Sequence, residues 1–148
     1  MTTIHASAVV VGARAVLIRG AAGSGKSQLA LRLIEAPASL ERPFARLVAD
    51  DRVAVAEAYG RLMVSPPAAL AGLIEIRGLG IRRIAYEPLA VVGLVVDLGD
   101  EAAERMPSRR KVEIASVTLP LLCLHPCADP LGVVLAALRT RDASMALP

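Results

Sequence analysis

The stretch "GAAGSGKSQLALRLIEA", from Gly20 to Ala36, decides what kind of fold this chain can adopt. Its first eight residues match the phosphate-loop (P-loop) pattern G-x-x-x-x-G-K-[ST] at every fixed position. In that pattern the glycines let backbone N–H groups turn inward around an anion. The lysine brings a positive charge to the β- and γ-phosphates, and the hydroxyl that follows suits Mg²⁺. The sequence therefore predicts a nucleotide-binding loop made of Gly20, Ala21, Ala22, Gly23, Ser24, Gly25, Lys26 and Ser27.

The residues on either side of this loop fit a strand and a helix. A short apolar run, Ala15 to Ile18, precedes the loop and is typical of a buried strand. After the loop, Leu29, Leu33 and Ile34 recur at helical spacing until Pro37 ends the pattern. The alternative is a chance glycine-rich turn, which the strand before the loop and the helix after it make the weaker interpretation. We therefore expect the loop to open a helix whose N-terminal dipole favours phosphate.

Length and composition indicate one domain, residues 1–148, with an aliphatic core. The chain is 55% hydrophobic but has no tryptophan and one phenylalanine. The net charge of +3 is scattered, and the basic cluster "RMPSRRK" (105–111) has no aromatic side chain to stack a base, so no nucleic-acid partner is expected. No run approaches ~18 uninterrupted apolar residues, so no membrane span is expected. The N-terminus lacks a charged leader, which favours a cytoplasmic protein.

The segment "CLHPCADP" places Cys123 and Cys127 on either side of His125. A metal site would need a fourth ligand and, in most such proteins, a second pair of cysteines. Neither is evident, so we expect a structural turn here. Reduced thiols would suit the cytoplasm.

The rest of the chain is expected to be rich in strands, with few helices. After the helix at 26–35 and a loop at 35–43, most patterns alternate with period two, and a hairpin turns near Tyr59 and Gly60. Strands are expected at 3–11, 15–19, 44–51, 80–86, 91–98 and 111–119, one helical turn at 67–72, and a final helix at 130–141. This pattern predicts an α/β fold with a mixed sheet, unlike the regular βαβ alternation of most phosphate-loop proteins.

Two adjacent carboxylates, Asp50 and Asp51, end the apolar run "RLVADD" about one strand after the loop. Phosphoryl transfer needs a carboxylate near Mg²⁺ and a group that positions or deprotonates the nucleophile. Neighbouring residues at a strand end point to opposite faces, so the two can divide these tasks. A turn or a helix cap is the alternative, and spacing alone does not rank the two aspartates.

The segment "LIEIRGLGIRRI" (73–84) is the other compact feature. Glu75 and Arg77 would share one face of a strand, and Gly78 and Gly80 would make the next residues pliable. Spacing alone favours an ordinary strand followed by a bend.

Four segments together resemble the HPr kinase/phosphorylase family, in its order and at similar intervals. They are "HASAV" (5–9), "GAAGSGKS" (20–27), "LVADDRVAV" (47–55) and "IEIRGLGI" (74–81). Within the last segment, "EIRGLG" (75–80) is the most specific part, because phosphate-loop proteins do not share it generally. The resemblance runs from about residue 5 to 105. It implies the short form of the family that has the catalytic domain alone, with a core similar to that of phosphoenolpyruvate carboxykinase.

The resemblance also implies an activity. Family members use ATP and Mg²⁺ to phosphorylate a serine of the phosphocarrier protein HPr, and they use inorganic phosphate to reverse the reaction. They are commonly hexamers, so a homo-oligomer is expected here. Which HPr paralogue is the target does not follow from the sequence.

Carried over by matching position, the resemblance implies roles for individual residues. Lys26 would contact the phosphates, while Ser27 and Glu75 would serve Mg²⁺. Asp51 would be the base that takes the serine proton, with Asp50 beside it as a second catalytic carboxylate and candidate Mg²⁺ ligand. His5 matches an active-site histidine, although by its pattern alone it would be an ordinary strand-end residue. Arg105 falls near a later catalytic arginine, where the surrounding match is loose.

One segment departs from the family. Where members carry a basic, glycine-containing loop that matters for dephosphorylation, this chain reads "LPLLCLHPCADP" (119–130). Pro120 fits, but the expected lysine and arginine are replaced, so the kinase direction is better supported than the reverse. Two alternatives stay open: a kinase of a small metabolite, and a non-catalytic module that senses ATP.

Overall fold

The ten-residue strand β1 (Thr2–Val11) organises the sheet of the protein. A computed structural model describes residues 2–37 and 44–140. Within it, the second half of β1 pairs antiparallel with β2 (Arg14–Arg19) on one side and with β3 (Ala45–Ala49) on the other. Its first residues pair with β4 (Arg52–Ala58). A single strand thus links two parts of the sheet.

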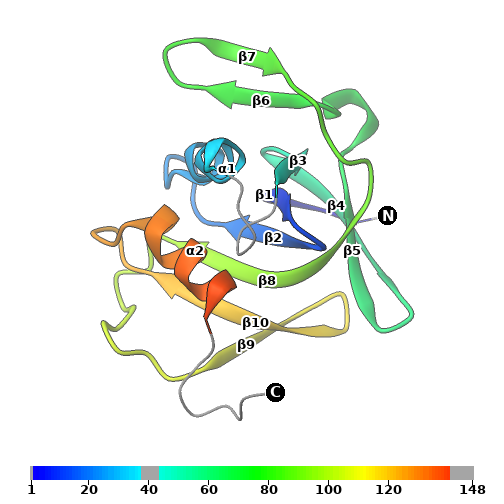
Figure 1. Ribbon diagram of the computed structural model, residues 1–148. Helices are drawn as coiled ribbons and strands as arrows, with labels where there is room; N and C mark the ends of the chain where they lie inside the picture. Colours follow the sequence, from blue (N-terminus) through cyan, green and yellow to red (C-terminus); the bar gives the residue numbers. More distant parts are fainter. Residues whose placement is uncertain (1, 38–43, 141–148) are drawn as a thin grey trace.

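The sheet closes on itself through β8. Strand β4 forms a hairpin with β5 (Arg61–Ser65), and β5 pairs with the start of β8 (Ala90–Leu98). The rest of β8 runs parallel to β2, so the strands β2, β1, β4, β5 and β8 form a ring. Beyond the ring, β10 (Val117–Leu124) lies parallel to β8 and antiparallel to β9 (Arg110–Ile114) (Figure 1).

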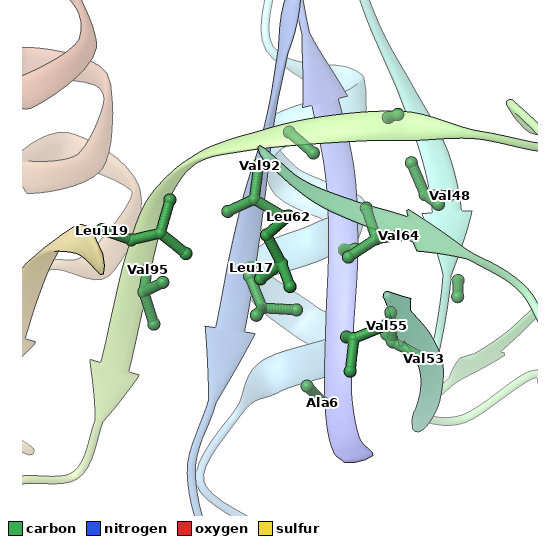
Figure 2. Close-up of a cluster of buried hydrophobic side chains, with 14 of the residues drawn as sticks. Ala6, Leu17, Val48, Val53, Val55, Leu62, Val64, Val92, Val95 and Leu119 are labelled. Carbon is green, nitrogen blue, oxygen red and sulfur yellow. The ribbon is translucent and has the colours of Figure 1, made fainter. Parts of the chain in front are cut away.

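Two hydrophobic cores lie on opposite faces of these strands. The first is enclosed by the ring and includes Leu17, Val64 and Val95 (Figure 2). The second lies under the helices α1 (Lys26–Glu35) and α2 (Pro130–Arg139). Strand β2 serves both, with Leu17 in the first core and its neighbours on the chain in the second, which explains its unbroken apolar run. Fully burying one such side chain contributes about 1.5–3 kcal/mol.

A separate hairpin of β6 (Leu73–Ile76) and β7 (Gly80–Arg83) follows the short 3₁₀ turn η1 (Ala68–Leu70). It forms a two-stranded sheet of its own, set apart from the main sheet on the side of α1 (Figure 1). Ile74 anchors it in the second core, while every residue of β7 is exposed. The strand and bend expected for this segment are confirmed.

Neither α1 nor α2, the two α-helices of the described part, is long and apolar enough to cross a membrane. The expected mixed, strand-rich α/β sheet is confirmed, because β8 pairs parallel with both β2 and β10 while the other strand pairs given above are antiparallel. The expected loop at 35–43 lies mostly outside the described residues, as does the last residue of the expected final helix.

One expected strand was wrong. The segment 111–119 contains parts of two strands, β9 and β10, which meet at a tight turn of Ala115 and Ser116. Both turn residues have positive φ, 49° and 68°. Glycine and asparagine are the residues that usually mark such a turn in a sequence, and neither is present here. Strand β10 then runs through Pro120, just before its pairing with β8 begins at Leu121.

Candidate active site

Polar side chains from three parts of the fold line one cavity of about 380 Å³. The loop after β2 and the start of α1 form one wall, the end of β3 and the start of β1 a second, and the β6–β7 hairpin a third. Of the residues expected to act, the cavity is lined by His5, Ala22, Gly23, Gly25, Lys26, Ser27, Asp51 and Glu75.

The 20–27 loop curls around the side chain of Lys26. This lysine is only 7% exposed, and its Nζ donates hydrogen bonds to the carbonyl oxygens of Gly20 at 2.8 Å and Ala21 at 3.1 Å. A Cβ on Gly20 would lie 2.5 Å from Ser24 Oγ, so only glycine fits at the start of the loop. Gly25, just before α1, has φ of 100°, which other residues rarely adopt. The loop thus holds a buried ammonium group at its centre.

The geometry of this loop fits an anion. No side chain caps the N-terminus of α1, so its first backbone N–H groups lack the partners that a cap would give. A Cβ on Gly23 would meet no atom within 4 Å, so the loop is open on that side. Among the described residues, the hydroxyl of Ser24 is a buried polar group without a hydrogen-bond partner. Phosphate is the ligand that such a helix start and lysine can bind.

Asp50 is a buried carboxylate, 5% exposed, that accepts hydrogen bonds from three donors. Ser27 Oγ donates to both of its oxygens, at 2.7 and 2.9 Å, and Ser7 Oγ donates to Oδ1 at 2.7 Å. The backbone N–H of Glu75 donates to Oδ2 at 3.1 Å. The carboxylate is therefore fixed between β1, α1 and β6, facing the Ser27 hydroxyl.

Asp51 has a different environment from its neighbour. Its side chain is 67% exposed and accepts a hydrogen bond at 2.7 Å from Nε2 of His5, which is 48% exposed. The backbone of Asp51 is in the left-handed region, with φ of 67°, and its carbonyl accepts a hydrogen bond from the N–H of Ala6. This conformation, which aspartate tolerates better than most residues, directs Asp51 into the cavity.

The arrangement has the oxygen groups that Mg²⁺ requires. Ser27 Oγ lies against Asp50, and Glu75 lines the same cavity while its backbone contacts Asp50. No group of three or more His, Cys, Asp or Glu residues in the described part is placed to hold a metal ion by itself. Mg²⁺ needs only one or two protein ligands, because water and nucleotide phosphates supply the rest. Ser27, Asp50 and Glu75 could therefore hold the ion together with a nucleotide.

Two expected features lie elsewhere. Arg105 is exposed in the segment between β8 and β9 and is not among the residues that line the cavity. The segment around His125 forms a turn, as expected, in which the N–H of Cys127 donates to His125 Nδ1 at 3.0 Å.

Sequence reasoning missed two residues of the site. Ser7 is fully buried and binds Asp50, although only its position two residues after His5, on the same strand face, could have suggested it. Arg77, in the turn after β6, lines the cavity beside Glu75, and its spacing from Glu75 in the sequence indicates no role for it.

The loop, the buried lysine and the carboxylates of this cavity have the geometry of a phosphate-binding site. Residues 1–87 match the family model described as the HPr Serine kinase C-terminal domain. This match covers more than half of the chain, and the chain belongs to that family.

Individual relatives agree with this assignment. The chain is 42% identical over 80 residues to an HPr kinase/phosphorylase of Clostridium tetani, covering 54% of this chain and 24% of the relative. It is 39% identical over 132 residues to that of Enterococcus faecalis, covering 80% of this chain and 40% of the relative. The chain thus spans less than half the length of these curated relatives.

A solved structure resembles the whole described fold. It is the Hpr(Ser) kinase/phosphatase from Coxiella burnetii, with a TM-score of 0.78 and 25% sequence identity. The similarity covers 94% of this chain and 95% of the other. The similarity in structure therefore extends well beyond the residues that the family model matches.

Proposed function

We propose that this protein is an ATP- and Mg²⁺-dependent serine kinase that phosphorylates the phosphocarrier protein HPr. The observation that carries the proposal is the convergence of three groups on one cavity: the 20–27 loop around Lys26, the Ser27–Asp50 pair, and the Asp51–His5 pair. Membership of the HPr serine kinase family supplies the acceptor.

The loop supplies phosphate binding. The free N–H groups at the start of α1 and the ammonium group of Lys26 bind the β- and γ-phosphates of ATP. Ser27, Asp50 and Glu75 would hold Mg²⁺, and the ion would supply positive charge to the phosphates. The Ser27 hydroxyl must turn from Asp50 to do so, and Ser7 and the Glu75 amide keep the carboxylate in place.

Asp51 is the better candidate for the base. It lies in the cavity with an exposed carboxylate, whereas Asp50 is buried and already accepts hydrogen bonds from three donors. Asp51 accepts the proton of the acceptor serine as the serine oxygen attacks the γ-phosphorus, the bond to the β–γ bridging oxygen breaks and ADP leaves. His5 orients the carboxylate through its 2.7 Å contact. In the reverse direction Asp51 returns this proton.

The reverse reaction is proposed to be slow. Between Pro120 and Pro126, His125 is the one ionisable side chain apart from the Cys123 thiol, so the segment offers no arginine or lysine for a second phosphate. Robust phosphate-dependent release of pyrophosphate from serine-phosphorylated HPr would contradict this point.

A transfer assay tests the main proposal. Purified protein is incubated with Mg-ATP and HPr, and HPr is examined by intact mass and phosphosite mapping, with Lys26→Ala as control. We expect phosphate on one HPr serine, and a rate at least about 100-fold lower with the variant, as for loss of a group that stabilises transferring charge.

Other outcomes would point to the alternatives. Tight ATP binding without transfer or turnover would overturn the kinase proposal and favour an ATP-sensing module. Turnover stimulated by a small metabolite but not by HPr would favour a metabolite kinase. Sedimentation of the same preparation would test the hexamer that the family resemblance implies.

A further inference from the structure

The β6–β7 hairpin stands away from the main sheet beside the candidate active site (Figure 1). In the described part of the chain, β7 pairs with β6 alone, and all four of its residues are exposed. Ile74 at the base is buried in the second core, and Ile76 and Ile84 pack against it. The hairpin is therefore anchored at its base and free along its outer strand.

The free part of the hairpin combines positive charge with apolar surface. From residue 76 to 86 the sequence contains three arginines, Arg77, Arg82 and Arg83, and no aspartate or glutamate. None of the three forms an ion pair with another described residue. Leu79 and Ile81 are 58% and 64% exposed. Arginine next to aliphatic surface is the composition of a protein interface, and the excess charge calls for an acidic partner.

The end of β6 and the turn that follows it are also a wall of the cavity. Glu75, Ile76 and Arg77 line the same space as Asp51 and Lys26. The outer strand extends about 13 Å, since each residue of a strand adds about 3.3 Å. A protein that presents a hydroxyl to Asp51 would therefore lie along the hairpin, whereas a small metabolite within the cavity would not reach it.

We propose that the β6–β7 hairpin is a docking element for the protein acceptor, and that it recognises an acceptor surface with carboxylates and apolar side chains beside the target serine. This inference rests on the proposed kinase function. It assigns the outer hairpin to substrate binding, separate from phosphoryl transfer, because Arg82 and Arg83 are exposed and do not line the cavity.

Steady-state kinetics with HPr test the proposal. The variant Arg82→Glu/Arg83→Glu reverses the charge of the outer strand, and Arg61→Glu/Arg109→Glu makes the same charge change at exposed positions elsewhere. We expect the first variant to raise KM for HPr at least about tenfold, equivalent to about 1.4 kcal/mol. Its kcat, and its affinity for a fluorescent ATP analogue, should stay within about twofold of the native protein, as should all constants of the control.

Further measurements separate the effect of charge from an effect on folding. Arg82→Lys/Arg83→Lys should restore most of the affinity, and thermal melting should show that each variant is folded. The KM of the native protein should rise with salt, and that of the charge-reversed variant should rise less, because screening weakens an attraction that only the native protein has. A separate Leu79→Ser/Ile81→Ser variant should raise KM without this change in salt dependence.

The contrary results are distinct. Transfer by the native protein, with KM unchanged in Arg82→Glu/Arg83→Glu, would overturn the docking role and leave the kinase proposal intact. Dissociation of an oligomer by this variant, with KM unchanged, would also overturn it and assign the hairpin to a contact between copies of the chain. A native protein that neither binds nor phosphorylates HPr would overturn the proposed function and this inference together.

Discussion

Two polar clusters lie near strand ends of the same sheet, and they differ in how their side chains are buried and hydrogen-bonded. The site cluster consists of His5, Ser7, Ser27, Asp50 and Asp51. The outer cluster consists of Asp100, Arg110 and Cys123, beside a hollow of about 250 Å³. The first has a buried carboxylate with three hydrogen-bond donors. The second has Arg110, which is 55% exposed and lies 3.1 Å from the Cys123 thiol and 3.9 Å from the Asp100 carboxylate.

The comparison shows that residue type does not decide what a polar cluster can do. Contacts of an exposed arginine are screened by water and cost side-chain entropy, so the outer cluster stabilises the protein little. Short contacts to a buried carboxylate hold it in one orientation, since each lost donor leaves a desolvated charge. The site cluster is therefore the one able to position reacting groups.

The largest expected difference concerns the exposed carboxylate of the site cluster. Asp51→Asn should lower the rate of transfer to HPr by about 10²–10⁴-fold, the usual contribution of a general base. The melting temperature should change little, because the side chain is exposed. Asp100→Asn, in the outer cluster, is the control and should leave the rate within about twofold.

Asp50→Asn extends this test to the ranking of the two aspartates. Full transfer by Asp51→Asn, with loss of transfer in a folded Asp50→Asn variant, would reverse the assignment of the base.

A second prediction concerns the buried donor Ser7. Removing its hydroxyl leaves Asp50 without one charge-assisted hydrogen bond, so Ser7→Ala should lower the free energy of unfolding by about 1.5–3 kcal/mol. Urea denaturation measures this loss. Ser108→Ala, an exposed serine beside the outer cluster, should change it by less than about 0.5 kcal/mol. Equal effects of the two substitutions would show that the site cluster is not held as described.

The smallest expected effect lies in the outer cluster. Burial raises the pKa of the Cys123 thiol, the nearby Arg110 guanidinium lowers it, and Asp97 and Asp100 raise it, with burial the largest cause. In a Cys127→Ser background, the midpoint of alkylation against pH should therefore lie above that of a free thiol. Arg110→Ala should move it higher still, since a cation that favours the thiolate is gone. A midpoint below that of a free thiol would contradict this reading.

The sign of the same shift gives a stability prediction. The folded state holds the Cys123 thiol proton more tightly than the unfolded chain does, because its pKa is raised. The contribution of this proton to the free energy of unfolding is therefore complete below the pKa of the unfolded chain, and it is lost as the pH rises through the pKa of the folded state.

Much of the fold could be predicted because local patterns determine it. The apolar run of β2, the helical spacing after the loop and the turn at Tyr59 and Gly60 each depend on a few neighbouring residues. The turn at Ala115 and Ser116 carries no such signal, because its positive φ angles are imposed on residues that rarely adopt them. The likeness to phosphoenolpyruvate carboxykinase and the single-domain organisation stay predictions.

Most residues that line the cavity could be named from the sequence, whereas their different environments could not. The sequence placed Asp50 and Asp51 together, but only the left-handed backbone of Asp51 separates an exposed carboxylate from a buried one. Ser7 contacts Asp50 across 43 positions of sequence, a distance that no local pattern records. The catalytic role of Arg105 stays a prediction. Arg105 does not line the cavity, and the rate of transfer by Arg105→Ala would test whether it acts in catalysis.

The parallel pairing of β2 with β8 has a consequence for the order in which the protein can form. Arg19 and Asp97, which lie opposite each other in this pairing and form an ion pair at 2.7 Å, are 78 positions apart. During synthesis on the ribosome, β2 and β5 therefore keep an open edge until β8 emerges. Such edges can pair with other chains, and contacts this distant slow folding. A nascent chain stalled at residue 87, although it holds the loop and both aspartates, would be the form most exposed to aggregation and to chaperones.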